Sequence, residues 1–129
     1  MNTKLLMSAS AVVMGITGIT LSFFPQEFVT LFKMADTNII VLQLLGGLYF
    51  GFAMLNWAAK ANLTGGIYSR PVAIGNLTHF VIGGLTLLKF ATRNIITTYI
   101  WIAVILYLVF AILFGFVLFT NPVMKNKPI

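Results

Sequence analysis

The chain contains no cysteine, and its 129 residues include only two acidic side chains and one histidine. Without cysteine, the chain has no disulfides, thiolate nucleophiles or CxxC redox motif, and it cannot hold an iron–sulfur cluster through thiolates. Glu27, Asp36 and His79 are too few to form a zinc site, and a haem bound by two histidines would require a second chain. We therefore expect no metal and no cofactor.

Hydrophobic residues make up 60% of the chain and charged residues only 8%, whereas soluble domains are about 25% charged. This composition indicates an integral membrane protein. We predict an all-α, four-helix transmembrane bundle that forms a single domain over residues 1–129. A spanning helix needs about 20 mostly apolar residues, which places the spans at about residues 5–24, 39–59, 71–90 and 95–119.

The first apolar run continues to Phe24 and ends at Pro25 without a small-residue cleavage site, so we interpret it as a retained span and not as a signal peptide. In the following segment, residues 26–33, Phe28 and Phe32 share one helical face while charged side chains can reach water. This pattern predicts a short interfacial helix on the bilayer surface. An ordinary loop with scattered aromatic residues is the alternative.

Small residues predict where the helices pack closely, because backbones approach one another in membranes where side chains are small. In the first span such residues recur every three or four positions on one face: Ser8, Ala11, Gly15, Gly18 and Ser22. The second span contains a GxxxG pattern, Gly47 and Gly51, which we assign first to packing within the bundle and second to a dimer seam. The full set of predicted packing glycines is Gly15, Gly18, Gly47, Gly51, Gly83 and Gly115.

The net charge of +6 would favour nucleic-acid binding in a soluble protein, but here the cations lie singly at the ends of spans, so we expect no nucleic-acid partner. One side of the predicted bundle carries Lys4, Lys60, Arg70, Lys125 and Lys127. The other side carries Lys33, Lys89 and Arg93. The positive-inside rule then predicts an integral protein of the bacterial cytoplasmic (inner) membrane with both termini in the cytoplasm.

The candidate site lies in the third span, where Asn76 and His79 share one face with Gly75, Gly83 and Thr86. We expect Gln43 of the second span and Tyr107 of the fourth to approach this face. Three interpretations stay open: hydrogen bonds that fasten the helices, a polar patch that orients a lipid, a quinone or another lipophile, and a proton relay or catalytic group.

Tyr68 and Arg70 lie just before this span, at the predicted cytoplasmic interface. The planar guanidinium of Arg70 can hold a phosphate or carboxylate headgroup. The alternative is that Arg70 only anchors the helix end at the interface.

Three segments carry a resemblance to a known group. They are the glycine-containing first span that ends in Phe24-Pro25, the run Gln43-Leu-Leu-Gly-Gly-Leu-Tyr-Phe-Gly51, and the segment Gly-Gly-Ile-Tyr-Ser-Arg-Pro71 before the third span. Together they resemble the DoxX-like group of small four-helix bacterial membrane proteins and its uncharacterised relatives. The resemblance implies a left-handed four-helix bundle and, for a few members, association with quinone-linked redox partners.

From these observations we expect a non-enzymatic accessory or lipophile-binding bundle that acts with a partner protein or as a homo-oligomer. Its partners would be membrane lipid, a quinone or another lipophile, and a second copy or a larger membrane complex. Two alternatives are a small subunit of a quinone-dependent membrane redox enzyme and a pore or carrier formed by oligomerisation.

The predicted topology can be tested by cysteine labelling, because the chain has no native cysteine. Cysteines introduced at Ala61 and Met124 should be shielded from an impermeant thiol reagent in intact cells. Labelling of both positions from outside would reverse the assigned orientation.

Overall fold

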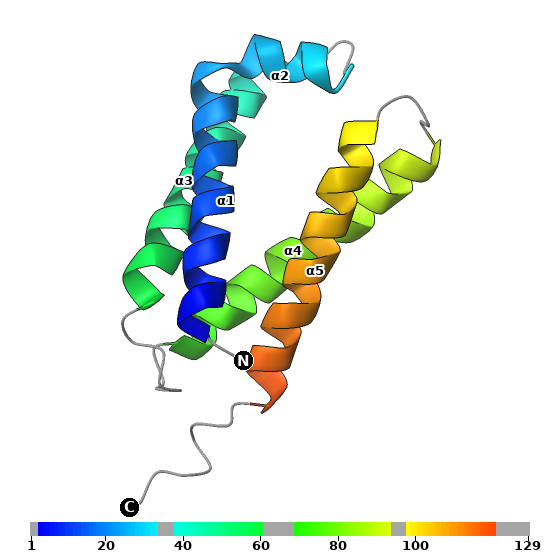
Figure 1. Cartoon of the computed structure of the whole chain (residues 1–129). Coiled ribbons are helices and arrows are strands. Elements are labelled where there is room, and N and C mark those ends of the chain that lie inside the picture. Colours follow the sequence, from blue (N-terminus) through cyan, green and yellow to red (C-terminus); the bar gives the residue numbers. More distant parts are fainter. Residues whose placement is uncertain (1–2, 34–37, 61–68, 94–97, 121–129) are drawn as a thin grey trace, which may run out of the picture.

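The computed structural model describes residues 3–33, 38–60, 69–93 and 98–120. These residues form an all-α fold in which α1, α3, α4 and α5 are long and apolar enough to cross a membrane (Figure 1). The helices are α1 (Thr3–Phe23), α2 (Pro25–Leu31), α3 (Ile39–Ala59), α4 (Ser69–Arg93) and α5 (Thr98–Thr120). The chain is thus a small integral membrane protein with four spanning helices, as its composition predicted.

The predicted spans agree closely with these helices. The second span has the predicted bounds, the first is shifted by one or two residues, and α4 extends beyond residues 71–90 at both ends. The predicted start of the last span, residue 95, lies outside the described residues. Hydropathy locates the membrane-spanning core of each helix, whereas a helix can continue past the apolar run into the interface.

The short helix predicted after the first span is α2. Phe24 separates α1 from α2, and Pro25 occupies the first position of α2. At that position the missing amide of proline removes no intrahelical hydrogen bond. Glu27 in the first turn complements the helix dipole. Asn38 caps the start of α3, where its side chain accepts a hydrogen bond of 3.1 Å from the Ile40 amide.

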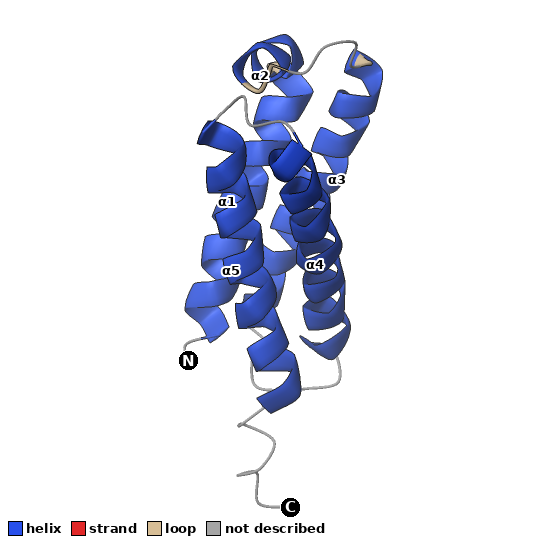
Figure 2. Cartoon of the chain, turned by 90° about the vertical axis from the view of Figure 1, so that its right-hand side faces the viewer, coloured by secondary structure: helices blue, strands red, loops and turns tan. Residues whose placement is uncertain are grey.

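The four spanning helices form two pairs, α1 with α3 and α4 with α5. The pairs lie close together where α1 and α4 begin, and they diverge toward the end that carries α2 (Figure 1). The view turned by 90° shows the four spanning helices running roughly along the long axis of the bundle, with α2 lying across one end (Figure 2).

The contact between α1 and α3 depends on two glycines, Gly18 and Gly46. A Cβ atom at Gly18 would lie 2.7 Å from the backbone nitrogen of Phe50 and 2.8 Å from the carbonyl oxygen of Gly46. A Cβ atom at Gly46 would lie 2.8 Å from both the Gly18 carbonyl oxygen and the Ser22 backbone nitrogen. The two backbones are therefore in direct contact. Of the predicted small-residue face, Ala11 and Gly18 are buried, and Ser8, Gly15 and Ser22 are half-buried.

The GxxxG pattern does not make the predicted contact inside the bundle. Gly47 and Gly51 are exposed, and a Cβ atom at either position would meet nothing within 4 Å in the described residues. The close contact falls at Gly46 because α1 lies against the face of α3 that contains Gly46. Gly47 is rotated by about 100° from that face.

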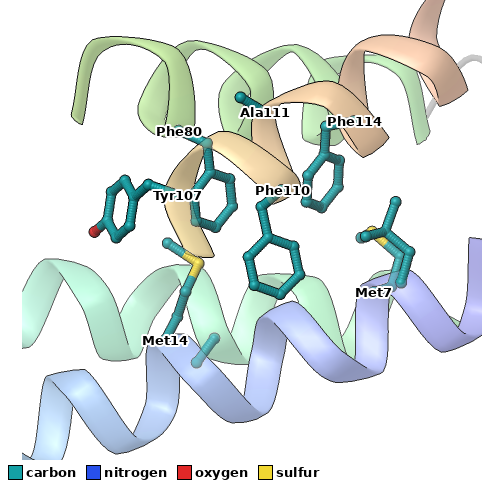
Figure 3. Packing of buried hydrophobic residues seen from close by; sticks show 9 residues of the cluster. Met7, Met14, Phe80, Tyr107, Phe110, Ala111 and Phe114 are labelled. Atoms are coloured by element: carbon teal, nitrogen blue, oxygen red, sulfur yellow. The ribbon is translucent and has the colours of Figure 1, made fainter. Parts of the chain in front are cut away.

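A buried aromatic core fills the space between the two pairs near the end where they converge (Figure 3). Met7 and Met14 of α1 face Phe80 of α4 and Phe110 and Phe114 of α5. The Phe80 ring is fully buried and stacks on the other two phenylalanines with centroid distances of 5.0 and 5.8 Å. A second, smaller cluster lies between α4 and α5 and consists of Ala91, Ile100 and Val104.

The convergent end of the bundle carries Lys4, Lys60 and Arg70 at the ends of α1, α3 and α4. The Lys60 ammonium lies 2.9 Å from the centroid of the Trp57 ring. A tryptophan covered by a cation at the end of a spanning helix is typical of the membrane–water interface.

Two adjacent glycines of α3 provide a matched test of the packing. Gly46→Ala should lower the free energy of unfolding by about 1–3 kcal/mol, because its methyl group would overlap the α1 backbone. Gly47→Ala should leave stability unchanged or raise it by up to about 1 kcal/mol, because alanine favours helix and the position is open. Thermal unfolding in mild detergent measures both, and equal effects at the two positions would contradict the assigned face.

Candidate functional site

Two side-chain amides join α3 to α4. Asn56 and Asn76 are both 0% exposed, and each donates a hydrogen bond to the other. The distance from Asn56 Nδ2 to Asn76 Oδ1 is 2.8 Å, and that from Asn76 Nδ2 to Asn56 Oδ1 is 2.6 Å. Paired amides satisfy polar groups that would otherwise be costly at membrane depth.

The remaining hydrogens of this pair also have partners. Asn56 Nδ2 donates to Ser10 Oγ of α1 at 3.1 Å, and Ser10 Oγ donates to the Met7 carbonyl at 2.9 Å. Asn76 Nδ2 donates to the Val72 carbonyl at 2.9 Å. All four amide hydrogens are thus used, and the pair offers no free donor to a ligand. This geometry favours a helix-fastening role for Asn76.

A second polar group, which we call the Tyr–His chain, consists of Tyr49 of α3, His79 of α4 and Tyr107 of α5. The Tyr107 hydroxyl lies 3.2 Å from His79 Nε2 and forms a hydrogen bond with the Tyr49 hydroxyl. The His79 ring therefore points into the bundle and reaches a group on the last span, as predicted. The Tyr–His chain therefore links both helix pairs, since α3 belongs to one pair and α5 to the other.

Counting protons shows that the Tyr–His chain always has a donor to spare. Neutral His79 and the two hydroxyl groups carry three donor hydrogens, but only two hydrogen bonds connect them. Whichever way these bonds are oriented, one hydrogen remains on His79 Nδ1, Tyr49 or Tyr107, and a charged imidazole would add another. Within the described part of the protein these three side chains have no further hydrogen-bond partner.

Aromatic rings surround His79. The Phe52 ring lies nearly parallel to the imidazole at a centroid distance of 5.6 Å, and Tyr49 and Phe80 meet it edge-on at 5.2 and 5.1 Å. Tyr107 is buried, whereas His79, Tyr49 and Phe52 are only half-buried. The two ends of the Tyr–His chain are therefore more accessible than its middle.

Gly83 makes room for Tyr107. A Cβ atom at Gly83 would lie 2.5 Å from Cε1 and 2.9 Å from Cδ1 of the tyrosine ring. The ring thus rests on the backbone of α4 one turn beyond His79. The predicted packing role of Gly83 is therefore also a positioning role for the Tyr–His chain.

The other candidate residues do not join this group. Gln43 is exposed, and its Nε2 donates to the Ser22 carbonyl of α1 at 3.4 Å. It does not reach His79, because it lies six positions before Tyr49 and so about 120° away around the helix. Arg70 is exposed near the start of α4, and Tyr68 lies outside the described residues. No group of three potential metal ligands exists in the described chain.

Sequence reasoning did not assign Tyr49, Asn56 and Ser10 to the candidate site. A signal for two of them exists, since Tyr49 and Asn56 are polar residues seven positions apart in an apolar span and so lie on one face. The pattern does not show which neighbouring helix that face meets. Ser10 shares its span with many small residues and has no distinguishing signal.

No known family model, no curated protein and no solved structure matches this chain.

The paired amides can be tested by a double-mutant cycle. Asn56→Leu should lower the free energy of unfolding by about 1–3 kcal/mol, because it leaves a buried amide of Asn76 without its partner. Asn56→Leu combined with Asn76→Leu should cost less than the sum of the two single changes, with a coupling of about 1 kcal/mol. Additive effects on thermal unfolding in detergent would show that the two amides do not depend on each other.

Proposed function

We propose that this protein is a non-enzymatic, lipophile-binding membrane protein that acts with a partner or as an oligomer, and that the Tyr–His chain holds the polar head of its ligand. The observation that supports the proposal is the donor hydrogen of the Tyr–His chain that has no acceptor among the described residues. The ligand would then carry a hydrogen-bond acceptor, such as the carbonyl of a quinone or of a lipid ester.

The spare donor of the Tyr–His chain lies in an apolar setting without an acceptor among the described residues. A buried donor without an acceptor costs about 1–3 kcal/mol, so an acceptor that reaches it is bound favourably. The rings of Phe52 and Phe80 beside His79 favour an apolar or flat group next to that acceptor. The spanning helices contain no acidic side chain, which favours a neutral ligand over a cation.

The setting of the ligand follows from the membrane location. We propose that the protein lies in the bacterial inner membrane with the convergent end of the bundle toward the cytoplasm, as its lysine and arginine distribution predicts. The resemblance to the DoxX-like group stays a prediction.

The first experiment is native mass spectrometry of the protein released from native membranes in mild detergent. It should show a retained neutral lipophile and report stoichiometry and co-purifying proteins in the same spectrum. The delipidated protein is then titrated with a decyl-substituted benzoquinone and, separately, with a short-chain phosphatidylglycerol. The two probes distinguish a ring carbonyl from an ester carbonyl.

Variants at the two ends of the Tyr–His chain test the site. Tyr49→Phe or His79→Phe should weaken binding of the better probe by about fivefold, since one hydrogen bond contributes about 1 kcal/mol. The end whose loss has the larger effect identifies the group that meets the ligand, and the double variant should bind most weakly. Tyr99→Phe, at an exposed tyrosine of α5, is the matched control. Wild-type binding by the double variant would refute this site.

A further inference from the structure

One aromatic residue connects the two helix pairs at their divergent end. Phe32, directly after α2, packs against the cluster formed by Ala91, Ile100 and Val104 on α4 and α5. Its ring also contacts that of Phe28 within α2, with a centroid distance of 4.5 Å. Because only Phe24 separates α2 from α1, this segment extends from the first helix pair to the second (Figure 1).

Among the described residues, the other contacts between the pairs extend from the middle of the helices to the convergent end. In the described part of the chain they include the Asn56–Asn76 amides, the Tyr–His chain and the aromatic core around Phe80. Among the described residues, the smaller cluster takes a side chain from outside α4 and α5 only at Phe32. Within the described residues, the pairs are therefore joined by a broad contact at one end and by the Phe32 side chain at the other.

Each pair is close-packed internally. Backbones touch at Gly18 and Gly46 in the first pair. In the second, Gly83 and Gly84 of α4 receive Tyr107 and Leu108 of α5. A change in the arrangement of the four helices would therefore move one pair against the other as a unit, with the broad contact as the hinge.

Within the broad contact, the Tyr–His chain lies on the side nearer to Phe32. Tyr49 precedes Asn56 by two turns in α3, and His79 follows Asn76 by about one turn in α4. Tyr49 and His79 therefore both lie on the side of the amide pair that faces the divergent end. Lys33, directly after Phe32, has a φ of 51°, so the right-handed helical backbone of α2 does not continue past Phe32.

We infer that α2 and Phe32 together set the separation of the two helix pairs. Through this separation they control how a lipophile reaches the Tyr–His chain from the membrane. The part of the inference that concerns ligand access rests on the proposed function. The part that concerns helix separation does not, and it can be measured without any ligand.

The ligand-independent test uses spin labels on cysteines introduced at Ile19 of α1 and Ile102 of α5, both exposed and near the divergent end. Electron–electron double resonance in lipid nanodiscs gives the distribution of distances between them. Phe32→Ala should broaden the distribution and shift it to longer distances. A second label pair at the convergent end, Leu55 and Phe119, should show no change.

The matched control is Phe23→Ala, which removes an exposed phenylalanine at the end of α1. It should leave both distance distributions as in the wild type. If Phe32→Ala does not fold, Phe32→Leu provides a smaller change with the same expected direction. A folded Phe32 variant with an unchanged Ile19–Ile102 distance distribution would show that Phe32 does not set the separation of the helix pairs.

Control of ligand access is tested by cross-linking position 32 to α5. Cysteines at Phe32 and Ile100 are joined by a short bismaleimide, and association of the decyl-substituted benzoquinone is followed by stopped flow. Cross-linking should slow association at least tenfold and leave the final affinity unchanged, because the Tyr–His chain itself is intact. An unchanged rate in a protein that binds the probe would overturn control of access, whereas absence of binding without the cross-link would refute the proposed function alone.

Discussion

The arrangement of the four spanning helices depends on the paired amides of Asn56 and Asn76. Both amides are fully buried and out of reach of bulk water, so each amide has to find its partner on the other helix. The reciprocal bonds fix both the register and the rotation of α3 against α4. Because Tyr49 and Asn56 share a face of α3, the same register brings Tyr49 to the group that contains His79.

Two kinds of helix contact stabilise this bundle, one within each helix pair and one between the pairs. Within each pair, glycines allow close approach and van der Waals contact over much of the helix length. Between the pairs, directional hydrogen bonds and stacked phenylalanines act over a shorter region. Close packing is tolerant of the exact neighbour, whereas hydrogen bonds accept only one arrangement. The polar contacts therefore select the fold from among the ways in which two apolar helix pairs could meet.

Most of the fold could be predicted from the sequence, because hydropathy and helix length alone define a membrane span. The proximity of His79 and Tyr107 was also predictable, since polar side chains on apolar helices seek one another. The sequence did not reveal the choice of Gly46 over Gly47, or of Tyr49 over Gln43. Each pair of alternatives differs by a rotation of α3, and that rotation is determined by the partner helices and not by α3 itself. The residues of α3 are apolar on every face of the helix, so its sequence pattern alone does not define which face points inward.

The order of the helices has a consequence for biogenesis. Both pairs are contiguous in the chain, so α1 and α3 can associate in the membrane before α4 leaves the ribosome. During that interval Asn56 lacks Asn76, and its described partners from its own pair are the Ser10 hydroxyl and the Met14 sulfur of α1. Ser10 would thus act as a temporary acceptor that keeps the Asn56 amide turned toward the place where α4 arrives. Assembly then ends with the docking of two preformed hairpins, and the last bonds to form are those that define the candidate site.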